Sequence, residues 1–280
     1  MFGLLGPNGA GKSTTVGICT TRIRPTAGSV RVEDVDVVRR PAAAKRRLGV
    51  VTQDNTLDRS LTLWEDLYHH QRYFGIAAAP ARRRADELLE RFRLTGRASG
   101  LPRQISGGMA QRLQIARAVS HDPAVLFLDE PTAGLDPQSR LLLWTLVREL
   151  QADGLTIVLT THHLEEAERL CERVAIVDHG QVLVCDRPEV LQREHGTGMV
   201  VELRLDGAVD DALVTALGRL DGVVAVDRRD DGLRVRAEDR DHLVGEVVAV
   251  VAGQGLTDLS VSRSSLEGVF IALTGRDLRE

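Results

Sequence analysis

Eight residues near the start of the chain have the types and spacing needed to hold a triphosphate. The segment GPNGAGKS, residues 6–13, fits the pattern G-x-x-x-x-G-K-[ST]. The glycines of such a loop let backbone N–H groups face phosphate oxygens, and the following helix N-terminus adds its positive dipole. Lys12 would reach the β and γ phosphates, and the Ser13 hydroxyl would ligate Mg²⁺. An apolar stretch precedes the loop and a helix-like stretch follows it, which favours a phosphate loop over an ordinary turn.

Two acids farther along the chain complement this loop. Asp129 and Glu130 directly follow the apolar residues 126–128. An acid that ends a buried strand emerges at the carboxyl edge of the sheet, where α/β proteins bind ligands. We therefore expect Asp129 to hold Mg²⁺, directly or through water, and Glu130 to orient and deprotonate the attacking water. A merely solvated acid pair is the alternative, and the glycine loop makes it the weaker interpretation.

A second glycine segment stands in front of a helix-like stretch. Ser106, Gly107 and Gly108 lead into residues 109–119, whose apolar positions have helical spacing. This segment is either a second anion-binding helix N-terminus or a plain serine N-cap with a flexible glycine pair. The residues of this stretch alone do not decide between the two.

The elements that must position these residues alternate between strand-like and helix-like stretches. Short runs apolar on both faces, separated by helices, predict a parallel sheet covered on both sides, and hence an α/β fold. The strand signal stops between residues 63 and 120, which predicts a helical insertion. After residue 197 the order becomes β-α-β-β-α-β, typical of a ferredoxin-like unit. We thus expect an ATPase-type domain over residues 1–197 and an accessory α+β domain over residues 198–280. The predicted parallel strands are residues 2–5, 48–51, 124–129, 156–161 and 174–178.

The composition of the chain limits the kinds of molecule that it is expected to bind. The chain has 280 residues, a net charge of -4 and a pI near 6.1, so nothing in its charge calls for nucleic acid. The sequence has no apolar run near the roughly 18 residues that a membrane span requires. Its cysteines, Cys19, Cys171 and Cys185, form no CxxC pair and favour reduced thiols in a cytoplasmic protein. Any role at a membrane is therefore expected to depend on a partner.

Taken together, the order and spacing of six elements resemble the ATP-binding subunits of ABC transporters. Such a match is far more specific than any single motif, although Ile105 and Met109 replace the commoner Leu and Gln around the glycine pair. The six elements are the phosphate loop at 6–13, Gln53 in VVTQD, SGGM at 106–109, LFLDE at 126–130, GLDP at 134–137, and His162 in LTTHHLEEAERL.

The resemblance implies a P-loop NTPase and a role for each matching residue. Gln53 would contact Mg²⁺ and sense a membrane partner, Asp136 would cross a dimer interface, and His162 would reach the γ-phosphate. Two subunits would dimerise head to tail, so that Ser106, Gly107 and Gly108 of one complete the ATP site of the other. The expected catalytic residues are Glu130, His162 and Lys12; the metal ligands are Ser13, Gln53 and Asp129; the nucleotide-binding residues are Gly6, Pro7, Asn8, Gly9, Ala10, Gly11, Lys12, Ser13, Thr14, Gln53, Ser106, Gly107, Gly108 and Asp136.

The C-terminal stretch SSLEGVFIALTGRDL narrows the resemblance. It is similar to the ending of the daunorubicin-resistance type of subunit, which serves ABC-2 exporters. This implies a homodimer, or a heterodimer with a similar ATPase, on the inner face of the cell membrane and bound to a separate permease. Drug or antibiotic efflux would follow, although the permease would select the cargo. A soluble non-transport ABC ATPase and an inactive nucleotide-binding regulator are the alternatives.

The position of the phosphate loop raises a further expectation. In family members of this kind, antiparallel strands and an adenine-stacking aromatic residue precede the loop, whereas here the loop begins at residue 6. Phe2 is not expected to replace that aromatic residue, because it lies on the strand that leads into the loop. We therefore expect Met1 to be an internal position and the true start to lie upstream.

Overall fold

The computed structural model describes residues 1–196, 198–206, 209–229, 232–238, 240, 242–262 and 265–274, so that the last residues of the SSLEGVFIALTGRDL stretch lie outside the described ones. Two compact units divide the chain, Met1–Leu183 and Val184–Glu280. This division falls before the predicted boundary at residue 197, because α8 (Pro188–His195) packs against α11 (Leu266–Thr274) within the second unit.

The first unit is built on a six-stranded sheet whose order is β4-β5-β6-β1-β7-β8. The neighbours β4/β5, β5/β6, β6/β1 and β1/β7 are all parallel, as the apolar runs predicted. A short hairpin of β2 (Arg31–Val32) and β3 (Val35–Asp36) forms a separate two-stranded sheet. The main strands are β1 (Phe2–Leu5), β4 (Leu48–Val51), β5 (Val125–Asp129), β6 (Thr156–Thr161), β7 (Arg173–Asp178) and β8 (Gln181–Asp186).

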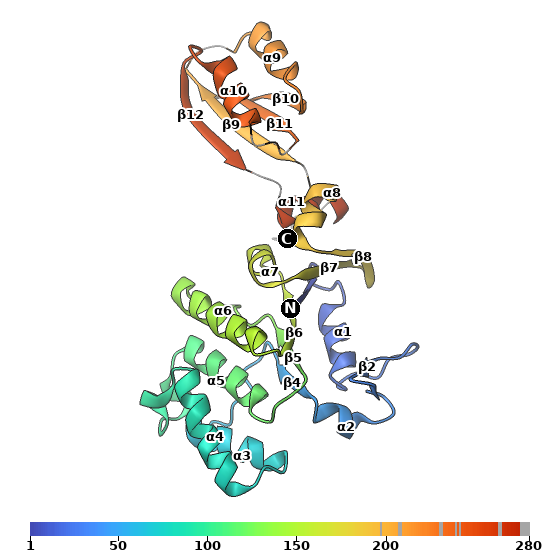
Figure 1. Cartoon of the computed structure of the whole chain (residues 1–280), viewed down its shortest axis with the longest axis vertical. Coiled ribbons are helices and arrows are strands. Elements are labelled where there is room, and N and C mark those ends of the chain that lie inside the picture. Colours follow the sequence, from blue (N-terminus) through green and yellow to red (C-terminus); the bar gives the residue numbers. More distant parts are fainter. Residues whose placement is uncertain are drawn as a thin grey trace. The chain divides into compact units, whose positions relative to one another are not determined.

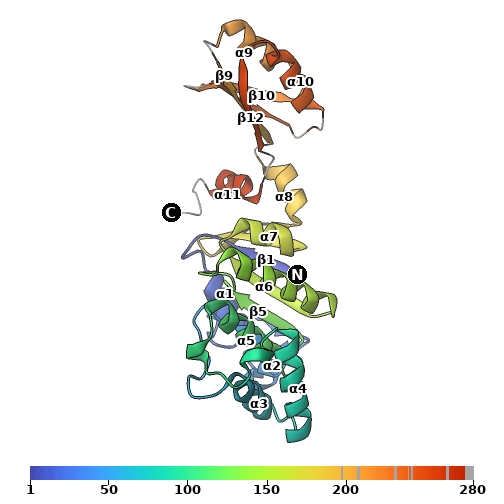
Figure 2. The same cartoon turned by 90° about the vertical axis from the view of Figure 1, so that its left-hand side faces the viewer.

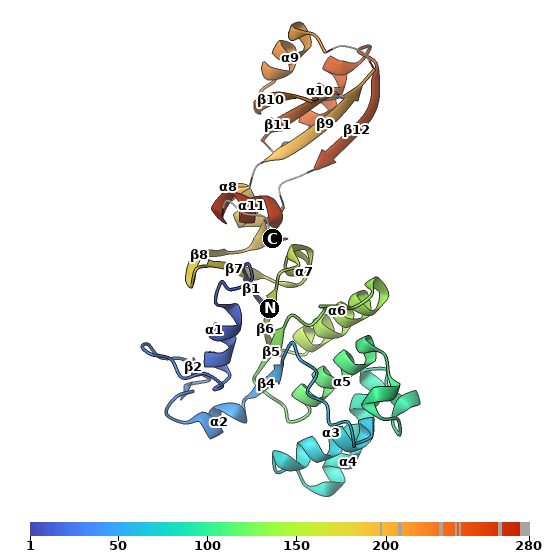
Figure 3. The ribbon, with the colours of Figure 1, turned by 180° about the vertical axis from the view of Figure 1, so that it is seen from behind.

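Helices cover both faces of this sheet. Figures 1 and 3 show α1 (Lys12–Cys19) on one face, with α5 (Gly107–Val119) and α6 (Pro137–Ala152) on the other. The short helix α7 (Leu164–Leu170) packs against β6 and β1. Strand residues that face these helices, such as Leu5 and Leu126, are fully buried. The carboxyl ends of β1, β4, β5 and β6 therefore meet at one edge of the sheet, which is the edge expected to bind ligands.

The predicted helical insertion is confirmed, since residues 63–120 are all described and contain no strand. It comprises α3 (Leu63–Tyr73), α4 (Ala78–Arg91), two 3₁₀ turns (Thr95–Arg97 and Pro102–Gln104) and α5. Helices α3 and α4 pack against each other and against α5 (Figure 2). A capping box starts α3, where Thr62 accepts from the backbone of Glu65 and the Glu65 side chain accepts from Thr62. A short helix outside this insertion, α2 (Pro41–Lys45), precedes β4.

The second unit contains a four-stranded antiparallel sheet of order β10-β11-β9-β12. Two helices pack on one face of this sheet (Figure 2), and the strand order is that of a split βαβ unit. Its core includes Val201, Leu217 and Val235, all with no exposed surface. None of the described helices, in either unit, is long and apolar enough to cross a bilayer. The elements are β9 (Met199–Leu205), α9 (Asp211–Gly218), β10 (Val223–Arg229), β11 (Gly232–Ala237), α10 (Leu243–Val251) and β12 (Leu256–Ser262).

Candidate active site

The glycine loop joins β1 to α1 in a conformation that requires its glycines. Gly9 and Gly11 have φ angles of 83° and 103°, which residues with a Cβ rarely adopt. Gly6 approaches β7 so closely that a Cβ there would lie 2.3 Å from the carbonyl oxygen of Val177. The amide of Gly180 donates to the carbonyl of Ala10 at 3.0 Å. The strand and the turn that follows it therefore hold the loop in a fixed shape.

Lys12 bridges this loop from the first turn of α1. Its Nζ donates to the carbonyl oxygens of Gly6 at 2.7 Å and Pro7 at 3.1 Å. The residue is 6% exposed, and burial lowers the pKa of the ammonium, while the nearby carboxylates of Glu130 and Asp129 act in the opposite direction. Lys12 and the two predicted acids therefore share one electrostatic site.

Glu130 lies at the centre of the predicted catalytic residues. Gln53 Nε2 donates to Glu130 Oε2 at 3.3 Å, and His162 Nδ1 lies 3.2 Å from Glu130 Oε1. These side chains come from segments that follow β4, β5 and β6, three neighbours in the sheet. Glu130 has a φ of 49°, a left-handed conformation that non-glycine residues adopt rarely and often at functional sites. Each oxygen of the carboxylate thus has one of these two side chains next to it.

Sequence reasoning missed Thr160, which connects the two acids. Its hydroxyl donates to Asp129 Oδ1 and accepts from the backbone N–H of Glu130 at 3.2 Å. The Glu130 N–H also donates to the Thr160 carbonyl at 3.0 Å. A weak signal exists in the sequence, because two hydroxyl residues end the otherwise apolar strand TIVLTT.

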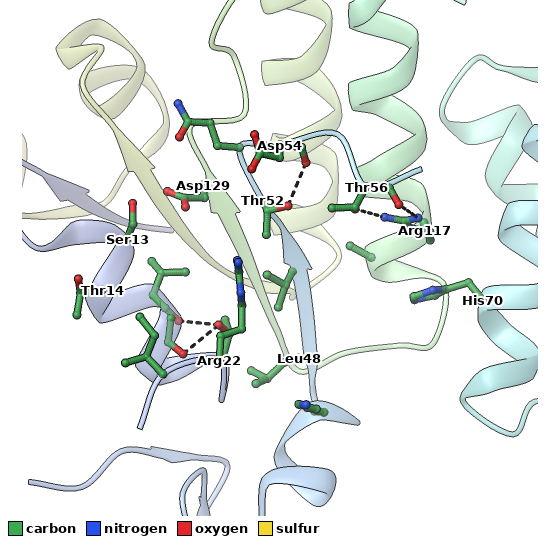
Figure 4. Close-up of a pocket in the computed structure, with 18 of the residues that line it drawn as sticks. Ser13, Thr14, Arg22, Leu48, Thr52, Asp54, Thr56, His70, Arg117 and Asp129 are labelled. Atoms are coloured by element: carbon green, nitrogen blue, oxygen red, sulfur yellow. Dashed lines mark hydrogen bonds between the residues drawn. The ribbon is translucent and has the colours of Figure 1, made fainter. Parts of the chain in front are cut away.

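A cavity of about 800 Å³ opens beside these residues. Figure 4 shows Ser13 and Asp129 toward one end of it, and His70 and Arg117 at the other. Ser13, Gln53 and Asp129 all line the cavity and offer hydroxyl, amide and carboxylate oxygens. Such oxygens are the ligands that Mg²⁺ prefers, so this donor set fits that ion.

Ser106, Gly107, Gly108 and Asp136 form a second group. Ser106 caps α5 and accepts from the amide of Met109 at 3.3 Å. Asp136 caps α6 by accepting from the amide of Ser139 at 3.0 Å. The Ser139 side chain and this amide lower the pKa of the Asp136 carboxyl group. A Cβ added to Gly108 would lie 2.6 Å from Ser139 Oγ. The structure therefore brings the serine-glycine segment next to Asp136, but none of these four residues is among those that line the cavity.

Comparison with known proteins gives the family. The family model described as "ABC transporter" matches residues 1–133. The chain is 42% identical over its whole length to the daunorubicin resistance ATP-binding protein DrrA3 of Streptomyces coeruleorubidus, and covers 88% of that protein. It belongs to the ATP-binding subunits of ABC transporters. This subunit is also 40% identical to the Nod factor export ATP-binding protein I of Ralstonia nicotianae, of which it covers 86%. It is 35% identical to the linearmycin resistance ATP-binding protein LnrL of Bacillus subtilis, of which it covers 91%.

Solved structures agree with this assignment. The ATP-binding subunit of an ABC transporter superimposes with a TM-score of 0.63 at 33% identity, over 69% of this chain and 81% of that one. A dimeric cassette in a post-hydrolysis state, bound to ADP and Pi, gives a TM-score of 0.61 at 29% identity, over 67% and 84%. The present ABC subunit is therefore a P-loop NTPase that binds and hydrolyses ATP, as its motifs predicted.

Proposed function

We propose that this ABC ATPase drives an export system by hydrolysing ATP as a dimer bound to a separate integral membrane permease of the ABC-2 type. The names of its relatives support export, since they include resistance to daunorubicin and linearmycin and export of Nod factor. The dimeric state of a solved relative supports a dimer, with either a second copy or a similar ATPase. The complex would lie on the cytoplasmic face of the membrane and serve drug or antibiotic efflux.

The convergence of Gln53 and His162 on Glu130 carries the proposed mechanism. In it, the backbone N–H groups of residues 6–14, except Pro7, which has none, and the Lys12 ammonium hold the phosphates and balance the charge that develops on them. Glu130 orients the attacking water and takes its proton. Gln53 and His162 hold the Glu130 carboxylate in a fixed orientation, because each lies within hydrogen-bond distance of a different oxygen of this group.

Ser13, Gln53 and Asp129 would hold Mg²⁺, as their shared position on the cavity wall supports. When bound, the ion would neutralise charge on the β and γ phosphates. Thr160 contributes by fixing the Asp129 carboxylate, to which its hydroxyl donates.

The second group of residues would act on the other subunit. Ser106, Gly107 and Asp136 are exposed, and Ser106 caps a helix whose N-terminus favours an anion. In a head-to-tail dimer, Ser106, Gly107 and Gly108 would contact the γ-phosphate held by the partner's loop. Asp136, beside them through Ser139, would lie at the same interface.

The decisive test of the chemistry is Glu130→Gln, which keeps the size of the side chain and removes the base. We expect kcat to fall by roughly 10²- to 10⁴-fold, the usual contribution of a general base. Dimerisation induced by ATP, followed by size-exclusion chromatography, should persist. Glu87→Gln is the matched control, because Glu87 is exposed and pairs with Arg83 at 3.4 Å on α4. A near-normal rate in Glu130→Gln would refute the role given to this carboxylate.

The test of coupling is co-expression with a candidate integral membrane permease of the ABC-2 type. We expect the two to purify together from detergent-solubilised membranes and ATP hydrolysis to rise on assembly into liposomes. An ATPase that sediments with ribosomes and ignores the membrane protein would contradict the export role.

A further inference from the structure

One acidic side chain outside the residues discussed so far is completely buried. Glu166 lies on α7, shortly after His162, and has no exposed surface. Its Oε1 accepts a hydrogen bond from the indole Nε1 of Trp144 at 3.0 Å. Burial raises the pKa of this carboxyl group, while its polar neighbours act in the opposite direction. A buried carboxyl group is expensive compared with an apolar side chain of the same volume, so its presence points to a specific task.

The polar neighbours of Glu166 belong to the catalytic segments. The backbone N–H of Glu166 donates to the carbonyl oxygen of His163 at 3.0 Å. Its carboxyl group lies near the hydroxyls of Thr161 and Thr132, but within the described part of the chain neither its Oε2 nor the Thr132 hydroxyl has a hydrogen-bond partner. Thr161 precedes His162, and its hydroxyl accepts from the backbone amide of His163 at 2.9 Å, which fixes the turn after the strand. The rings of His162 and His163 lie only 4.1 Å apart. The orientation of His162 therefore depends on a turn that Glu166 supports.

Trp144 connects the same carboxyl group to α6. The indole is 7% exposed, and the guanidinium of Arg169 lies 5.5 Å from its ring centroid. Asp136 caps helix α6, and Ser139 of this helix packs against Gly108 of α5. The hydrogen bond between Glu166 and Trp144 thus links the His162 turn to the helix that carries the proposed dimer-facing residues.

We propose that Glu166 is a positioning residue. It holds the turn that carries His162 in a fixed position relative to α6, and so sets the distance between the His162 ring and the Glu130 carboxylate. It acts through Trp144 and the turn at His162 and His163, and touches no substrate. This inference rests on the proposed role of His162, and the experiments below separate the two.

The first experiment is Glu166→Gln in the full chain assembled with its permease. The amide oxygen can still accept from Trp144, but the carboxylate charge beside the Thr161 and Thr132 hydroxyls is lost. We expect kcat to fall about tenfold with KM for ATP unchanged, because the turn that carries His162 is then held less firmly. Glu165→Gln, the neighbouring residue whose exposed side chain pairs with Arg169 at 3.0 Å, is the matched control and should retain normal turnover.

The second experiment places Glu166→Gln on a His162→Ala background. If Glu166 acts through His162, the double variant should be no slower than His162→Ala alone. If Glu166→Gln lowered kcat by the same factor in the wild type and in His162→Ala, the inference would be wrong, because Glu166 would then act independently of His162. A normal rate in His162→Ala would refute the role proposed for His162, on which the inference rests. Loss of turnover in His162→Ala but not in Glu166→Gln would refute only the inference.

A third variant separates positioning from stability. Glu166→Leu combined with Trp144→Phe removes both partners of the buried hydrogen bond, so neither polar group remains without a partner there. We expect thermal stability equal to or above that of the wild type, with turnover still reduced about tenfold or more. A stable double variant with normal turnover would overturn the inference, even if Glu166→Gln failed to fold.

Discussion

At the scale of single residues, burial of His70 in the helical insertion favours the neutral form of its side chain. Its ring lies 5.1 Å from that of Phe74 and 5.9 Å from that of His121. Burial lowers the pKa of His70 to about 4, and the positive charge of Arg117 acts in the same direction. The unfolded chain, whose histidine pKa is about 6.5, therefore binds more protons between pH 4 and pH 6.5. Neutral His70 contributes stability above pH 6.5 that is lost as the pH falls through this range.

We expect the free energy of unfolding to decrease from pH 7 to pH 5 by on the order of 1 to 2 kcal/mol on account of His70. Denaturant titrations at several pH values would measure this slope. His70→Gln should flatten it, whereas His69→Gln, at the exposed neighbouring position, should leave it as in the wild type. Parallel curves for the wild type and His70→Gln would show that His70 does not cause the slope.

Some residues of the site were predictable because their chemistry restricts their type. A phosphate loop needs its glycines and lysine, and a strand-end acid pair is uncommon, so Lys12, Asp129 and Glu130 stand out in the sequence. Thr160 and Trp144 do not, because hydroxyl and indole groups occur throughout proteins. Their contacts with Asp129 and Glu166 depend on strand register and helix packing, which sequence spacing alone does not give.

At the scale of elements, the contact of α5 with α6 depends on a missing side chain. A Cβ on Gly108 would lie 2.6 Å from Ser139 Oγ and 2.8 Å from Ser139 Cβ. We expect Gly108→Ala to lower the free energy of unfolding by about 1 to 3 kcal/mol through overpacking. Thermal unfolding monitored by circular dichroism would measure the loss.

The adjacent glycine provides the control for that substitution. A Cβ on Gly107 would meet nothing within 4 Å, so Gly107→Ala should be neutral or stabilise α5 by about 0.5 to 1 kcal/mol. Ser139→Gly should recover part of the stability lost in Gly108→Ala, because it removes both opposing atoms. Equal stability of the two alanine variants would contradict the packing argument.

The elements differ in how far their sequences reveal them. Strands β1, β4, β5, β6 and β7 were predicted because parallel strands buried on both faces are continuously apolar. Strand β8 was missed because it lies at the sheet edge, where Val182 is 62% exposed. Strands β2 and β3 have only two residues each, too few to show a period.

At the scale of the whole molecule, the two units have separate hydrophobic cores. The core of the second unit is formed by its own sheet and helices, and Leu217 within it is fully buried. We expect Leu217→Ala to destabilise this unit by about 2 to 5 kcal/mol. Hydrogen exchange should accelerate in β9 and β11 and stay unchanged in β1 and β5. Equal acceleration in both sheets would show that the units unfold as one.

The family was predictable at this scale because six motifs occur in a fixed order. The assembly was not predictable from the residues alone, because exposed helix starts such as Ser106 and Gly107 have no periodic pattern. The transported substrate was not predictable from this chain either, because the permease would select it.

The hydrogen bonds of Lys12 to Gly6 and Pro7 bear on the speed of nucleotide capture. Main-chain oxygens accept from the ammonium, and Gly180 donates to Ala10, so hydrogen bonds within the chain itself shape the loop. A loop shaped by its own hydrogen bonds loses little conformational entropy when phosphate binds, because little of it has to be ordered at that moment. The association rate should therefore follow diffusion and ionic strength, with no lag from a rare receptive conformation.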